Sequence, residues 1–158
     1  MYAFTLRLAD FTQGLNRVHL EAPATGVGLD AETWPTLLVM DLDVDRMGDQ
    51  FALRGTVEAR SQEECARCLE RFEAPRSFEF EAFAEPAARG GGDDRIAEYV
   101  LRHDGRILVL DDEVREQALL ARPMTSVCRP ECPGLCPRCG ANLGDGPCGC
   151  AERGERAT

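Results

Sequence analysis

The stretch FALRGTVEARSQEECARCLERFEAPRSFEFEAF, residues 51–83, decides the fold of this chain. Apolar and charged residues alternate at period two over residues 51–60 and again, less regularly, over residues 77–83. This period is typical of strands that bury one face. Cys65 and Cys68 lie between the two alternating segments, so we expect the pair at or near the tip of an antiparallel connection between two strands.

The same alternation extends outward from this stretch toward the N-terminus. Further strands are predicted at residues 2–8, 18–20 and 36–44. One helix is expected after them, with Asp111 as its cap and an end near Ala121. Pro123 sets this end, because a proline disfavours helical geometry in the residue before it.

The length of 158 residues suits one domain with a single core. Residues 1–126 are predicted to form an α+β domain, mainly an antiparallel β-sheet with one or two helices. A glycine run predicts a flexible loop near residues 88–94 within it. Residues 127–150 are rich in Gly, Pro and Cys and are predicted to be a zinc-binding segment docked on that domain. Residues 151–158 are predicted to be a disordered tail.

The eight cysteines form four close pairs, which are Cys65/Cys68, Cys128/Cys132, Cys136/Cys139 and Cys148/Cys150. The N-terminal residues lack a basic segment followed by an apolar one, so the chain is expected in the reducing cytoplasm, where thiols favour metal over disulfides. Short spacings and cysteine-only ligands predict one or two structural zinc ions. An iron–sulfur cluster, or half-buried thiols at the first pair, are the alternatives.

The spacing leaves two groupings of these ligands open. In the preferred grouping, Cys65 and Cys68 meet Cys128 and Cys132, and the last four cysteines form a local site. In the competing grouping, the two C-x-x-C pairs bind one ion together. Either grouping would stabilise a segment that has no apolar core of its own.

The composition argues against several classes of protein. The formal net charge is −10, so nonspecific attraction to nucleic-acid phosphates is not expected. The sequence has no phosphate-binding loop, no nucleophile elbow and no apolar run long enough to span a membrane, and we predict that the protein is neither an enzyme nor a membrane protein. Its two histidines are interpreted as a strand residue, His19, and a loop residue, His103. The alternative to a protein without catalysis is a thiol–disulfide redox or metal-sensing protein that uses the C-x-x-C pairs.

Three motifs resemble the YceD family, the large ribosomal RNA subunit accumulation proteins. They are Cys65-Ala66-Arg67-Cys68-Leu69-Glu70, the helix from Leu110 to Gln117 with the following Leu120-x-x-Pro123-Met124, and the string from Cys132 to Leu143 that contains Gly134-Leu135-Cys136-Pro137-Arg138-Cys139-Gly140. The resemblance covers roughly residues 51–150. It implies a role in the accumulation or maturation of large-subunit ribosomal RNA, without catalysis.

The acidic charge narrows the partners that this resemblance leaves open. We expect the protein to engage a basic ribosomal protein or an assembling large-subunit particle, and no small-molecule substrate. Direct contact with ribosomal RNA would need a local group of arginines. The candidates beside the cysteines are Arg67, Arg71, Arg129 and Arg138, with ordinary solvated charges as the alternative interpretation.

Overall fold

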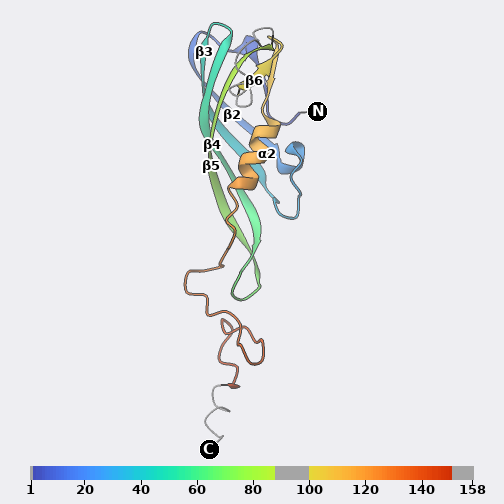
Figure 1. Ribbon diagram of the computed structural model, residues 1–158, viewed down its shortest axis with the longest axis vertical. Coiled ribbons are helices and arrows are strands. Elements are labelled where there is room, and N and C mark those ends of the chain that lie inside the picture. The colour runs from blue at the N-terminus through green and yellow to red at the C-terminus, as the bar shows by residue number, and fades with distance from the viewer. Residues whose placement is uncertain (1, 88–99, 151–158) are drawn as a thin grey trace, which may run out of the picture. The chain divides into compact units, whose positions relative to one another are not determined.

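The chain is described from a computed structural model that covers residues 2–87 and 100–150 (Figure 1). The predicted flexible loop near residues 88–94 and the predicted disordered tail at 151–158 lie outside these described residues. The chain divides into two compact units. The sheet unit comprises Met1–Ser61 and Pro75–Arg122, and the cysteine unit comprises Gln62–Ala74 and Pro123–Thr158. The domain boundary predicted between residues 126 and 127 stays a prediction.

The main sheet has five strands in the order β2-β3-β4-β5-β6. They are β2 (Gly14–Pro23), β3 (Leu37–Met47), β4 (Gln50–Glu64), β5 (Arg71–Pro86) and β6 (Val100–His103). Strand β3 pairs antiparallel with both β2 and β4, whereas β6 is parallel to β5. A second, two-stranded sheet joins β1 (Thr5–Arg7) and β7 (Ile107–Val109) antiparallel. The predicted α+β class, mainly antiparallel, is confirmed.

The core lies on one face of the main sheet, because the period-two alternation places apolar side chains there. Met40 and Leu53 are fully buried, whereas Asp41 and Arg54, their neighbours in sequence, are exposed. Helix α2 (Asp111–Leu120) belongs to the same unit (Figure 1). Its Val114 and Ala118 are part of the same core. Two short 3-10 helices, η1 (Leu8–Asp10) and η2 (Ala24–Val27), complete the described helices. None of the helices in residues 2–87 and 100–150 is long and apolar enough to cross a membrane.

Two sequence-based interpretations in the sheet unit are wrong. Helix α2 does begin at Asp111, but this carboxylate does not cap it. It accepts hydrogen bonds from the backbone N–H groups of Ala3 and Phe4 instead, at 3.0 and 2.7 Å, and so ties the N-terminal segment to the start of the helix. His103 is a buried strand residue rather than a loop residue, since it is the last residue of β6 (Val100–His103). Its ring contacts the backbone carbonyl of Asp49 at 2.9 Å.

Strand β4, which leads to the first cysteine pair, depends on a glycine. Gly55 lies opposite Leu42 of β3. A Cβ atom at residue 55 would lie 1.9 Å from the backbone oxygen of Asp41, far inside van der Waals contact. Only glycine allows the two strands to approach this closely. The pairing of β3 and β4 therefore requires a residue without a side chain at this position.

Candidate metal centres

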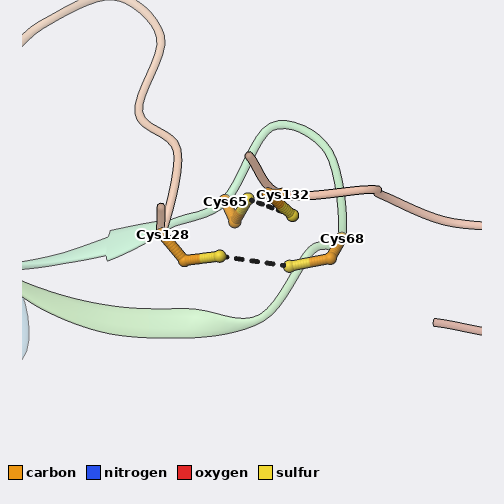
Figure 2. A group of neighbouring side chains, drawn as sticks. All are labelled: Cys65, Cys68, Cys128 and Cys132. Atoms are coloured by element: carbon orange, nitrogen blue, oxygen red, sulfur yellow. Dashed lines mark hydrogen bonds between the residues drawn. The ribbon is translucent and has the colours of Figure 1, made fainter. Parts of the chain in front are cut away.

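Four cysteines from distant parts of the sequence form the first centre, within the cysteine unit. Cys65 and Cys68 lie in the turn between β4 and β5, and Cys128 and Cys132 lie in the segment that follows α2 (Figure 2). The four sulfur atoms all lie within 4.8 Å of one another. Cys65 is fully buried, Cys68 and Cys132 are 5% and 4% exposed, and Cys128 is half-buried. The first centre is therefore largely closed to solvent.

The sulfur spacing of the first centre fits a tetrahedral metal ion. The Cys65 and Cys132 sulfurs are 3.8 Å apart, as are those of Cys68 and Cys128. Two thiolates bound to one zinc ion at about 2.3 Å in tetrahedral geometry are separated by about 3.8 Å. A disulfide would need the two sulfurs at about 2.05 Å. The four thiols are thus spaced for shared coordination and not for disulfide pairing.

The last four cysteines form the second centre, which is local in sequence. Cys136, Cys139, Cys148 and Cys150 place their sulfurs within 4.8 Å of one another. Cys136 is buried, Cys148 and Cys150 are half-buried, and Cys139 is exposed. The two groups of four follow the preferred grouping from the sequence, and the two C-x-x-C pairs do not share a site.

Each centre contains a knuckle, by which we mean a C-x-x-C pair and the two residues after it. In both knuckles, the first residue after the second cysteine donates its N–H to the carbonyl of the first cysteine. The N–H of the first cysteine donates to the carbonyl of the second residue after the pair. The four bonds run from Leu69 to Cys65 at 2.9 Å, Cys65 to Glu70 at 2.9 Å, Gly140 to Cys136 at 2.9 Å and Cys136 to Ala141 at 2.8 Å. The two knuckles therefore share the same pattern of backbone hydrogen bonds.

The two knuckles differ in the residue that reverses the chain. This residue takes a left-handed conformation in both, with φ of 62° at Leu69 and 73° at Gly140. A left-handed backbone conformation raises the conformational energy of a residue with a side chain by about 1–2 kcal/mol, whereas glycine adopts this conformation with almost no such increase. Leu69 is the only described residue other than glycine with a positive φ. The first knuckle thus carries backbone strain that the second avoids.

Backbone N–H groups prepare one thiol in each centre for metal binding. The N–H of Cys128 is the main cause that lowers the pKa of the Cys65 thiol to about 6. The N–H groups of Cys139 and Arg138 lower the pKa of Cys136 to about 6 as well. Metal ions bind the thiolate form, so these hydrogen bonds favour coordination.

Crowding of sulfur atoms acts in the opposite direction at Cys150. Its neighbours Cys139 and Cys148 raise its pKa to about 12. Several thiolates in one small space repel one another, and a bound cation would offset this repulsion. The second centre is therefore suited to hold a divalent metal, which would deprotonate the remaining thiols.

An arginine occupies the same place in each knuckle, directly before the second cysteine. Arg67 donates two hydrogen bonds from Nη1, to the carbonyls of Pro130 at 3.2 Å and Cys132 at 3.1 Å. Arg138 donates from Nη1 to the carbonyl of Cys150 at 3.2 Å. Each arginine thus fastens its knuckle to the segment that carries the other two cysteines of the same centre.

The four arginines predicted as possible RNA contacts therefore differ in role. Arg67 and Arg138 hold the centres together, a role that sequence reasoning missed although the repeated C-x-R-C spacing signals it. Arg71 and Arg129 are exposed on the same unit. Contact of any of the four with RNA stays a prediction.

Hydrogen bonds also join the two centres within the cysteine unit. The N–H of Leu135 donates to the carbonyl of Arg67 at 3.1 Å. The Asn142 side chain donates to the Glu70 carboxylate at 2.8 Å and accepts from the N–H of Gly144 at 2.9 Å. Glu70 and Asn142 are thus positioning residues for both knuckles, and the sequence had singled them out only as part of a motif.

Comparison with curated proteins finds several relatives from mycobacteria. Two proteins named as uncharacterized, from Mycobacterium bovis and Mycobacterium tuberculosis, are each 33% identical over 129 residues. These alignments cover 77% of this chain and 59% of each relative. An uncharacterized protein of Mycobacterium leprae is 29% identical over 121 residues, or 75% of this chain and 54% of the relative. The chain thus spans less than two thirds of the length of these relatives.

No solved structure matches the chain. The model of one protein family, described as the large ribosomal RNA subunit accumulation protein YceD, matches residues 53–157. The match begins in β4 and includes α2 and all eight cysteines of the two centres. This chain therefore belongs to the YceD family.

Proposed function

We propose that this protein is a non-enzymatic ribosome biogenesis factor that supports the accumulation or maturation of large-subunit ribosomal RNA. The observation that carries the proposal is the family match over residues 53–157, whose description names large ribosomal RNA subunit accumulation. The matched region is the part of the chain that holds both candidate metal centres. The cytoplasm, where ribosomes are assembled, is the proposed location.

Structural zinc at both centres is the second part of the proposal. Four thiolates at tetrahedral spacing are the donor set of a structural zinc site. In the first centre, the ion would fasten the turn between β4 and β5 to the segment that follows α2. The coordination would replace the hydrophobic core that this unit lacks, since its buried cluster consists mainly of the cysteines themselves.

A closed four-thiolate site also supports a role without catalysis. Catalytic zinc keeps one coordination position for water or substrate, whereas four protein ligands fill all positions of a tetrahedral ion. Each centre of this chain offers four cysteines. We therefore propose that the ions hold a binding surface in shape and that no small-molecule substrate is converted.

The charge of the protein favours a basic partner. Eight thiolates contribute −8 and two Zn²⁺ ions contribute +4, so the formal charge of −10 becomes about −14. A charge of this size attracts basic proteins and repels bare phosphate backbones. The proposed partner is a basic ribosomal protein or an assembling large-subunit particle, with direct contact to ribosomal RNA confined to local arginines such as Arg71 and Arg129.

Sucrose-gradient profiles of a strain that lacks the gene test this function. We expect reduced large subunits, accumulated precursor particles and lower levels of mature large-subunit ribosomal RNA, restored by the wild-type gene. Normal large-subunit particles and normal ribosomal RNA levels would contradict the proposal. Levels of the small-subunit ribosomal RNA serve as the internal control.

The second candidate function is thiol–disulfide redox or metal sensing, and the exposure of Cys139 is the observation that favours it. An exposed thiolate in a metal site is the position that an oxidant reaches first. The redox form of this function predicts that the purified protein contains titratable disulfides in place of bound metal. Two bound zinc ions that withstand mild oxidants would argue against it.

A further inference from the structure

Leu69 combines two features that a residue in a turn rarely has together. Its backbone takes the left-handed conformation, with φ of 62°, and 56% of the residue is exposed. The equivalent position of the second knuckle carries Gly140, which takes the same conformation without strain. The leucine side chain is therefore held at this place against the preference of the backbone.

The fold of the cysteine unit gives no reason for a leucine at this position. The buried cluster of the unit consists of Cys65, Cys68 and Cys132, with Phe72, Cys128 and Leu135 packed against it, and Leu69 is not part of it. A glycine would keep the same turn and the same hydrogen bond to the carbonyl of Cys65. Strain retained for an exposed side chain points to contact with another molecule.

Further apolar side chains are exposed on the same unit, close to the first centre in sequence. Val127 directly precedes Cys128 and is 37% exposed, and Met124 is fully exposed. Leu69 directly follows Cys68, whose sulfur lies 3.8 Å from that of Cys128. Leu69 and Val127 thus flank the two cysteines that face each other in the first centre. Exposed apolar side chains that gather on one surface are a feature of protein-binding sites.

The charge of the cysteine unit indicates the kind of partner. Residues 62–74 and 123–150 contain four arginines and six acidic residues, a balance of −2. Eight thiolates and two Zn²⁺ ions would lower this to about −6. A surface with this charge and an apolar anchor fits a basic protein segment better than RNA.

We propose that Leu69 anchors a docking surface on the cysteine unit for a basic protein segment that offers an apolar pocket. This proposal rests on the proposed function, since ribosomal proteins of the assembling large subunit are the basic proteins it would meet. The first knuckle then has two roles, as a ligand pair for the first centre and as the support that presents Leu69.

Binding measurements with the full-length, metal-loaded protein test the proposal. Leu69→Gly removes the side chain and the strain together, and Leu69→Ala removes the side chain but keeps a left-handed residue that is not glycine. Leu15→Ala is the matched control, because Leu15 is 63% exposed on β2 of the sheet unit. The two probes are the total proteins extracted from purified large subunits and the deproteinised large-subunit ribosomal RNA, each immobilised.

We expect the extracted proteins to retain the wild type and Leu15→Ala equally, and both Leu69 variants about tenfold less, as for the loss of an interface anchor. Leu69→Gly should keep its metal content and melt at or above the wild-type temperature. Retention of both Leu69 variants at the wild-type level would overturn the proposal. Wild-type retention on the RNA alone, or a lower melting temperature of Leu69→Gly, would overturn it as well.

Complementation of the deletion strain separates this proposal from the proposed function. If the deletion strain has a large-subunit defect that the wild-type gene corrects, the gene for the Leu69→Gly variant should fail to correct this defect, although the variant protein is produced at the wild-type level. Full restoration by Leu69→Gly would overturn the docking surface and leave the proposed function standing. A deletion strain without any defect would overturn both.

Discussion

The two candidate centres share one backbone plan, yet the first is buried and joins distant segments, whereas the second is more exposed and local. In the first, 59 residues separate Cys68 from Cys128, and three of the four cysteines are buried. In the second, eight residues separate Cys139 from Cys148, and only Cys136 is buried. The same coordination chemistry can therefore serve a long-range fastening in one place and a local turn in another.

Loss of one cysteine ligand from each centre should give the largest effects and the largest difference. Each of Cys68→Ser and Cys139→Ser should remove one metal ion per chain. Because the closed loop of the first centre is longer, loop-closure entropy predicts that Cys68→Ser lowers the free energy of unfolding by about 2 kcal/mol more than Cys139→Ser. Denaturant unfolding, with the metal content measured on the same samples, checks this. Equal losses of unfolding free energy in the two variants would contradict the expected difference between the centres.

An exchange of the residues that reverse the two knuckles should shift stability in opposite directions. Among the described residues, apart from Gly140 and its two neighbours in the chain, no heavy atom lies within 4 Å of a Cβ at residue 140, so Gly140→Leu tests mainly the backbone conformation. We expect it to destabilise the cysteine unit by about 1–2 kcal/mol, and Leu69→Gly to stabilise it by up to that amount. Thermal melts of both variants measure the two shifts. A destabilised Leu69→Gly would show that the leucine supports the fold.

Removal of metal by a chelator should occur in two phases. Cys139 is exposed and Cys65 is fully buried, so the second centre should release its ion first. A difference of about 1.4 kcal/mol in local opening corresponds to about a tenfold difference in rate. A colorimetric zinc assay after chelator addition checks this, with Cys139→Ser as the control that lacks the fast phase. A single phase for two ions would contradict the difference in accessibility.

The arginines that fasten the knuckles should give the smallest effects. Arg67→Gln removes a donor of two hydrogen bonds and Arg138→Gln a donor of one. Both side chains are exposed. We therefore expect the free energy of metal binding to weaken by about 1 kcal/mol for Arg67→Gln and by about 0.5 kcal/mol for Arg138→Gln. Competition with a zinc indicator measures the affinity of each centre. A larger loss for Arg138→Gln would reverse the expected order.

Much of this architecture follows from local patterns in the sequence. The alternation over residues 51–60 predicts strand β4, because one face of it must be buried. The spacings within the cysteine pairs predict that all eight side chains gather in metal-type clusters, and the structure forms the preferred two groups. In both cases a short stretch of sequence contains the local signal, whereas the grouping of the four cysteine pairs depends on the tertiary fold.

The features that the sequence did not predict depend on distant parts of the chain. The carboxylate of Asp111 can cap its own helix or bind the N–H groups of residues 3 and 4, and only the tertiary fold decides between them. His103 lies in a strand of four residues, too short for a clear alternation. Leu69 was missed because sequence rules expect glycine where φ is positive.

Native mass spectrometry of the full-length protein, purified under reducing conditions without added metal, tests the central claim most directly. The claim is that eight cysteines hold two structural zinc ions in two separate centres. We predict a mass for two zinc ions and eight reduced cysteines, with one ion lost in Cys68→Ser and the other in Cys139→Ser. A metal-free chain, a chain with disulfides, or loss of both ions in each variant would contradict the account.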